Sequence, residues 1–143
     1  MIEINKNFLW YKLRKNLLGS KTNYENLRNK KILITGGTGF IGSWIVHGLS
    51  IINTNHNLNI TLILLVRSKE KINRFKFLDK FINIEYVLGD ITKFKLINKD
   101  ITHLIHAAGV YKATKSEIRK VIEKAAENIL KIIRKNKINN LIF

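Results

Sequence analysis

The sequence predicts an α/β fold, a doubly wound parallel sheet that is incomplete because the chain ends at the start of its fifth strand. Three observations predict it. Strand-like and helix-like patterns alternate along the chain. The apolar run at 60–66 is continuous, as in strands that are buried on both faces of a sheet. Six of the eight glycines follow predicted strand ends, where an open sheet binds its ligand: Gly36, Gly37, Gly39, Gly42, Gly89 and Gly109.

The individual elements follow from their local patterns. Short β-branched or apolar runs that end in glycine or polar residues predict strands at 31–35, 60–66, 83–88, 103–108 and 141–143. Apolar residues that recur every three or four positions predict helices at 7–18, 43–52 and 68–78. A longer helix is expected from the capping pair Thr114 and Glu117 to the polar turn at Asn136. We divide the chain into a helical extension at 1–28 and an α/β domain at 29–143.

The N-terminal helix is basic and partly amphipathic. Leu9, Leu13 and Leu17 lie one helical turn apart with lysines and an arginine between them, a pattern that would also suit a targeting or membrane-surface helix. The segment contains Glu3 and lacks the apolar region and cleavage pattern of a signal peptide. We therefore expect a helix that packs against the domain.

The composition restricts the function classes. The net charge of +16 would suit a nucleic-acid-binding protein, but lysine, asparagine and isoleucine are all abundant and proline is absent, as AT-rich codon usage produces. The basic residues form no stripe with interleaved aromatic residues, so we do not expect nucleic acid as a partner. The chain has no cysteine, and its four histidines lack the spacing of ligands, so we expect no metal site.

The longest apolar runs are too short for a membrane span, which needs roughly 18 residues. We expect a cytoplasmic protein without a membrane partner. The composition does not exclude a homo-oligomer.

A glycine-rich turn joins the first predicted strand to the first helix of the domain. Glycine permits a tight turn at position 36, a close approach of the backbone to phosphates at 39, and close helix packing at 42. The following helix would offer free N–H groups and the positive end of its dipole to an anion. The turn therefore predicts a site for the pyrophosphate of a dinucleotide, formed by Gly36, Gly37, Thr38, Gly39, Phe40, Ile41 and Gly42.

The spacing of Gly36, Gly39 and Gly42 resembles the TGxxGxxG motif of the extended short-chain dehydrogenase/reductase family, which includes the NAD-dependent epimerases and dehydratases of nucleotide sugars. Two more segments, Gly89-Asp90-Ile91-Thr92 and His106-Ala107-Ala108-Gly109, are similar to the family's adenine-contacting and ribose-contacting segments. The resemblance covers residues 31–143. It implies a Rossmann-type domain that binds NAD or NADP, with Asp90, Ile91, Ala107, Ala108 and Gly109 at the cofactor.

Several of these roles have structural alternatives. Asp90 would contact adenine according to the resemblance, or it caps the turn after the third strand. Asn128 lies where the family often has an asparagine, so it is either a catalytic relay or a buried amide bonded to the backbone. His106 is expected to be a packed, hydrogen-bonded residue rather than a participant in chemistry.

The choice of cofactor depends on the end of the second strand. NAD-specific relatives usually carry an acidic residue there, whereas this sequence has Arg67 and Ser68. An arginine can pair with the 2′-phosphate of NADP, so Arg67 favours NADP over NAD.

The family's catalytic tyrosine and lysine are expected beyond Phe143. Tyr111 and Lys115 have the YxxxK spacing, but they straddle the cap at Thr114 and do not share a helical face. We therefore assign no catalytic residue other than Asn128 as a candidate. We expect the NAD(P)-binding part of an enzyme that acts on a nucleotide sugar when full length, with residues 1–143 alone inactive. The alternatives are a non-catalytic NAD(P)-binding module or degenerate fragment, and a basic nucleic-acid-binding protein.

Overall fold

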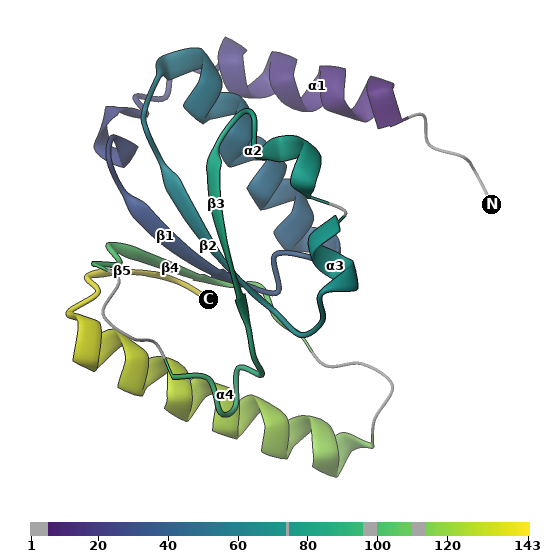
Figure 1. Ribbon diagram of the computed structural model, residues 1–143, viewed down its shortest axis with the longest axis vertical. Helices are drawn as coiled ribbons and strands as arrows, with labels where there is room; N and C mark the ends of the chain where they lie inside the picture. The colour runs from purple at the N-terminus through teal and green to yellow at the C-terminus, as the bar shows by residue number, and fades with distance from the viewer. Residues whose placement is uncertain (1–5, 74, 96–99, 110–113) are drawn as a thin grey trace.

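The computed structural model describes residues 6–73, 75–95, 100–109 and 114–143, with side chains described from residue 11 onward. Its centre is a sheet of five parallel strands in the order β3-β2-β1-β4-β5 (Figure 1). The strands are β1 (Lys31–Thr35), β2 (Thr61–Val66), β3 (Asn83–Leu88), β4 (His103–His106) and β5 (Asn140–Ile142). The chain therefore winds outward from β1 in both directions, and the α/β fold of the Rossmann type is confirmed.

The register brings the ends of the two central strands level with each other. Thr35, the last residue of β1, pairs with Leu65 on one side and with His106, the last residue of β4, on the other. The first residues of the two helical crossovers therefore leave the sheet side by side at its carboxyl edge, which is the place where open α/β sheets bind their ligands.

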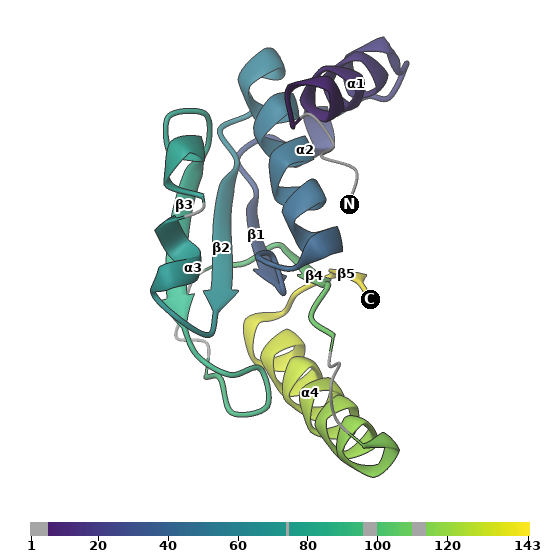
Figure 2. The same ribbon diagram turned by 90° about the vertical axis from the view of Figure 1, so that its right-hand side faces the viewer.

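Helices cover both faces of the sheet (Figure 2). One layer contains α2 (Phe40–His56), the single turn α3 (Glu70–Asn73) and the 3₁₀ turn η2 (Lys76–Leu78), and the other layer is α4 (Lys115–Asn136). Alternate residues of β1 divide between the two cores: Ile32 and Ile34 pack with α2, whereas Leu33 packs with α4. This two-sided burial explains why the strand sequences are continuously apolar.

The long helix α4 begins as the sequence predicts. The Thr114 hydroxyl accepts a hydrogen bond from the Glu117 N–H at 3.3 Å, and the Glu117 carboxylate accepts one from the Thr114 N–H at 2.8 Å. The apolar residues of α4 are only partly buried, because Ala125 and Ile129 lie in the core whereas Ile122 is exposed.

Other element boundaries differ from the predictions for local reasons. The expected helix at 68–78 is replaced by α3 and η2, since backbone bonds such as Phe75 N–H to the Ile72 carbonyl span three residues and wind the chain more tightly. Helix α2 begins at Phe40 rather than at 43, directly after Gly39. Strand β4 ends at His106 rather than at 108.

The N-terminal helix α1 (Lys6–Gly19) packs against α2, and the short turn η1 (Glu25–Leu27) leads from it into β1. The Leu17 side chain approaches Gly48 of α2, and the Leu17 carbonyl accepts a hydrogen bond from the Tyr24 hydroxyl at 3.2 Å. Within the described ranges, the structure contains no helix long and apolar enough to cross a membrane. The division of the chain at residue 28 stays a prediction.

Candidate functional site

The turn between β1 and α2 is built on a left-handed glycine. Gly36 has a φ of +71°, and a Cβ atom placed there would lie 2.4 Å from the backbone nitrogen of Ala108. Both the backbone conformation and the contact with the end of β4 exclude a side chain at this position. The tight turn expected at position 36 is therefore present, and it is also the place where the crossovers after β1 and β4 meet.

Two further glycines hold the start of α2 against the turn. A Cβ atom at Gly42 would lie 2.1 Å from the Gly36 carbonyl oxygen, so the first turn of α2 packs directly on backbone. A Cβ atom at Gly37 would lie 3.2 Å from the side chain of Leu64. These contacts fix α2 close to β1 and β2 and set the direction of its axis.

The start of α2 is open on its outer side. Gly39 is the residue that precedes the helix and is exposed, and its N–H donates to the Gly36 carbonyl at 2.8 Å. Phe40 and Ile41 begin the helix with exposed fractions of 84% and 66%. Their N–H groups belong to the first turn of a helix, which has no acceptor within that helix, and they carry the positive end of its dipole. An anion such as a pyrophosphate could be held here.

The end of β4 lies directly beside the glycine turn. The Ala107 N–H donates to the Thr35 carbonyl at 2.9 Å, which continues the sheet by one residue, and Ala108 then contacts Gly36. The His106 Nδ1 and the Thr35 hydroxyl form a hydrogen bond of 2.5 Å. Burial lowers the pKa of His106, so the imidazole is uncharged at neutral pH. His106 is therefore a packed, hydrogen-bonded residue, as expected.

The Thr35 hydroxyl is a feature that the sequence analysis missed. Thr35 is fully buried at the end of an otherwise apolar strand, and its bond to His106 ties the last residue of β1 to the last residue of β4. The sequence does carry a signal for this role of Thr35, because it is a polar residue that ends an apolar run directly before a glycine turn.

The ends of β2 and β3 carry the residues expected near the ribose and adenine. Arg67 follows β2 and is exposed, Ser68 is half-buried, and Asp90 follows β3. The charge of Arg67 contributes a smaller part to the lowering of the pKa of Asp90. The larger cause is Thr92, whose hydroxyl and N–H donate to the Asp90 carboxylate at 2.6 and 2.8 Å. Asp90 therefore does cap its turn, and the carboxylate is ionised.

Asn128 is a backbone-bonded amide on α4. Its Nδ2 donates to the carbonyls of Ile91 and Phe94 at 2.7 and 2.8 Å. Because both carbonyls belong to the segment that follows Asp90, the side chain holds that segment against α4. The structure thus gives Asn128 the structural role that the sequence left open. Tyr111 lies outside the described residues, and Lys115 is the first residue of α4.

We expect Asn128→Ala to lower the free energy of unfolding by about 1 to 3 kcal/mol, because two carbonyls lose their donor in a half-buried place. Urea denaturation followed by circular dichroism measures it. The neighbouring Glu127 is exposed, so Glu127→Ala is the matched control and should change the stability by less than about 0.5 kcal/mol. Equal stability of the two variants would contradict the structural role of Asn128.

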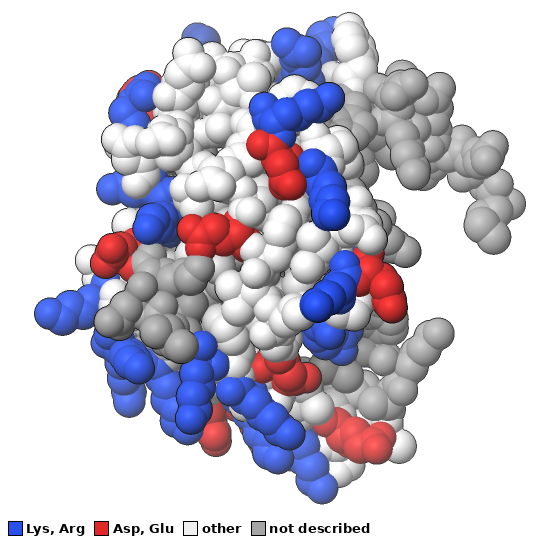
Figure 3. All heavy atoms as spheres, in the orientation of Figure 1, with Lys and Arg blue, Asp and Glu red and all other residues white. Residues whose placement is uncertain are grey.

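Charge is distributed unevenly around this framework. Figure 3 shows Lys and Arg gathered toward the lower part of one face, over the region of α4, with Asp and Glu among them. Arg119 and Glu123 of α4 form one such mixed pair at 2.8 Å. The basic side chains on this helix therefore have some acidic ones among them.

The model of the 3-beta hydroxysteroid dehydrogenase/isomerase family matches residues 33–143, from the middle of β1 to the last residue. The chain belongs to this family. The predicted resemblance to the extended short-chain dehydrogenases and reductases is thereby confirmed, and the family is NAD(P)-dependent. The comparison with curated protein sequences gave no match.

Solved structures share the fold. Pen from Bacillus thuringiensis aligns with a TM-score of 0.64 and 20% identity over 80% of this chain and 36% of its own. A protein from Bacillus halodurans that is described as an NAD-dependent epimerase/dehydratase aligns with a TM-score of 0.54 and 15% identity, over 78% of this chain and 49% of its own. A ketoreductase domain from the bacillaene assembly line has a TM-score of 0.55 and 20% identity, over 80% of this chain and 32% of its own. The chain therefore spans less than half the length of each of these structures.

Proposed function

We propose that this family member binds NADP in preference to NAD at the carboxyl edge of its sheet, with the pyrophosphate over the turn between β1 and α2. The observation that carries the proposal is the contrast within that turn. At Gly36 and Gly42, backbone contacts exclude any side chain, whereas Gly39 and the first two residues of α2, Phe40 and Ile41, are exposed. Such a turn fits a dinucleotide, whose phosphates need a close approach to backbone donors.

The remaining cofactor contacts are proposed around this centre. Arg67 and Ser68 would receive the 2′-phosphate, Asp90 and Ile91 would contact the adenine, and Ala107 to Gly109 would border the adenosine ribose. Arg67 directly follows β2 and Asp90 follows the neighbouring parallel strand β3, so both lie at the same edge of the sheet, which supports this arrangement. The full set is Gly36, Gly37, Thr38, Gly39, Phe40, Ile41, Gly42, Arg67, Ser68, Asp90, Ile91, Ala107, Ala108 and Gly109.

The bound cofactor would supply hydride transfer, and the residues described here would bind it and orient it. Neither Tyr24 nor Tyr86 supports a proton donor at this site. Burial raises the pKa of Tyr86, whose hydroxyl donates to Asp79 at 3.2 Å, and Tyr24 bonds to the end of α1. We therefore propose that residues 1–143 bind the cofactor without turning over substrate.

The substrate proposed for a complete enzyme is a nucleoside-diphosphate sugar, on the strength of the glycine motif and the segments that follow β3 and β4. The description of the matching family favours a hydroxysteroid as the second candidate. Both classes present a secondary alcohol that a nicotinamide cofactor oxidises. Activity assays of a chain that extends past Phe143, with each alcohol class and NADP, distinguish them.

Calorimetric titration with NADP and NAD tests the cofactor proposal. Wild type should bind NADP more tightly, and Arg67→Ala should weaken NADP binding roughly tenfold while leaving NAD binding nearly unchanged, because only NADP carries the phosphate that the guanidinium would pair with. Lys69→Ala removes a neighbouring exposed charge and serves as the control. An equal loss for both cofactors would overturn the NADP preference. Binding of neither cofactor to the wild type would overturn the whole proposal.

A further inference from the structure

The N-terminal helix α1 carries apolar side chains on two faces. One face packs on α2, where Leu13 and Leu17 line an apolar groove. Tyr11 and Leu18, seven positions apart, lie together on the helix and are turned roughly 130° around its axis from that packed face. Their exposed fractions are 63% and 37%. The helix therefore presents a second apolar face to solvent, which we call the outer face.

Cationic side chains border the outer face. Arg14 lies three positions after Tyr11, and Lys15 lies three positions before Leu18, so one charge stands on each side of the apolar pair. Both cations are exposed. The sequence contains no aspartate or glutamate from position 4 to position 24. The outer face is therefore positive as well as apolar.

The position of α1 leaves this face accessible. The helix lies at one end of the molecule, outside the two layers that cover the sheet, and α4 lies at the other end (Figures 1 and 2). Because α2 covers only the packed face of α1, an extended flat surface can approach the outer face without meeting the sheet or α4.

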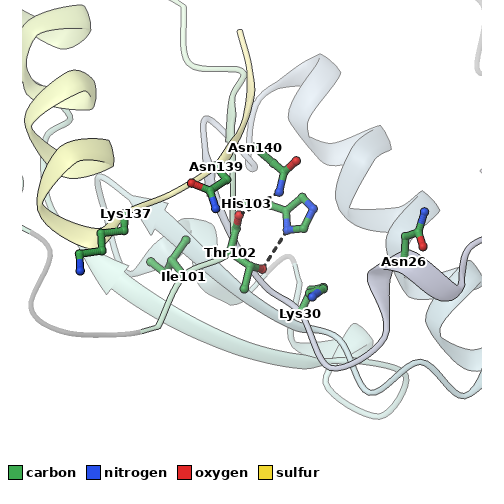
Figure 4. A pocket seen from close by; sticks show the side chains of 8 residues that line it. All are labelled: Asn26, Lys30, Ile101, Thr102, His103, Lys137, Asn139 and Asn140. Atoms are coloured by element: carbon green, nitrogen blue, oxygen red, sulfur yellow. Dashed lines mark hydrogen bonds between the residues drawn. The ribbon is translucent and has the colours of Figure 1, made fainter.

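Other positive regions of the surface differ from this one. In the polar hollow where the chain enters β1, β4 and β5, the Lys137 side chain points away from His103, so the charges do not gather at one point (Figure 4). The cations of α4 have acidic residues among them, and one of these, Glu123, pairs with Arg119. Neither region combines cations and exposed apolar side chains without a carboxylate.

We propose that the outer face of α1 binds the negatively charged surface of a phospholipid membrane. Arg14 and Lys15 would lie against the anionic head groups, and Tyr11 and Leu18 would enter the boundary between head groups and acyl chains. Tyrosine suits that boundary, because its ring is apolar and its hydroxyl is polar.

The chemistry of the outer face favours a membrane over other partners. Two copies of this face would repel each other, because each carries only positive charge. A nucleic acid would pair with the cations, but its phosphates offer no apolar contact to Leu18. The expectation of no membrane partner followed from the short apolar runs, which argue against a membrane span and not against binding at the surface.

Sedimentation of the full chain with sucrose-loaded vesicles tests the proposal. The chain should bind vesicles of phosphatidylcholine that contain about a third phosphatidylserine, and it should not bind vesicles of phosphatidylcholine alone. The double variant Arg14→Gln/Lys15→Gln should bind the mixed vesicles roughly 30-fold more weakly, at about fivefold for each charge. Tyr11→Ser/Leu18→Ser should weaken binding as well, since less apolar surface would enter the boundary.

The matched control is Lys124→Gln/Lys131→Gln, which removes the same charge from exposed positions of α4. This variant should bind the mixed vesicles nearly as well as the wild type. Equal losses in the two charge variants would mean that only the total charge matters, and would overturn the proposal. A wild type that binds duplex DNA and not the mixed vesicles would also overturn it. Circular dichroism checks that each variant is folded, as expected for exposed positions.

Discussion

Replacing Gly39 by leucine is expected to weaken binding of NADP at least 100-fold, which corresponds to about 2.7 kcal/mol, while the chain stays folded. Gly39 has an ordinary φ of −81°, and a Cβ atom there would meet only the Gly36 carbonyl, at 3.1 Å. A leucine therefore fits the backbone, but its side chain would cover the first N–H groups of α2. Calorimetric titration measures the affinity, and circular dichroism checks the fold.

The matched control is Gly19→Leu. Nothing lies within 4 Å of a Cβ atom at Gly19, which ends α1 away from the glycine turn. This variant should bind NADP like the wild type. If Gly39→Leu also binds like the wild type, the cofactor does not lie over the start of α2.

Replacing Gly36 by alanine is expected to lower the free energy of unfolding by roughly 2 to 6 kcal/mol, from left-handed strain and overpacking together. The added Cβ would lie 2.4 to 2.5 Å from the backbone of Ala107 and Ala108, neither of which can turn aside as a flexible side chain could. A loss of this size is comparable to the whole stability of a small domain. Urea denaturation measures the loss of free energy. If the loss exceeds the stability of the wild type, the variant is unfolded even without urea.

Gly19→Ala provides the comparison, because it makes the same chemical change where there is open space. Its stability should remain within about 0.5 kcal/mol of the wild type. A denaturation midpoint for Gly36→Ala equal to that of Gly19→Ala would show that the turn relaxes, which would contradict the close contact between β1 and β4.

The sequence alone predicts those elements whose local residue pattern agrees with their packing in the folded chain. The continuous apolar runs predict strands that are buried on both faces, and β1, β2 and β3 lie within one residue of their expected positions. The capping pair predicts the start of α4 because both of its hydrogen bonds are local. The glycine turn was predictable because close backbone approach leaves glycine as the one acceptable residue at positions 36 and 42.

The remaining features depend on contacts between distant segments. Helical spacing at 68–78 could not reveal that the burial of Phe75 and Leu78 tightens the chain into short turns. The bond between Thr35 and His106 joins residues 71 positions apart, and the amide of Asn128 reaches carbonyls more than 30 positions away.

Because Gly36 lies against Ala107 and Ala108, binding of a ligand at this edge of the sheet is linked to the stability of the folded chain. The groups that would hold a dinucleotide come together only when β1, α2 and β4 are assembled, so a ligand there binds the native chain and not the unfolded one. At a free concentration of 100 times its Kd, such a ligand adds about 2.7 kcal/mol to the free energy of unfolding. The cellular supply of cofactor would then help to set how long each copy escapes proteolysis.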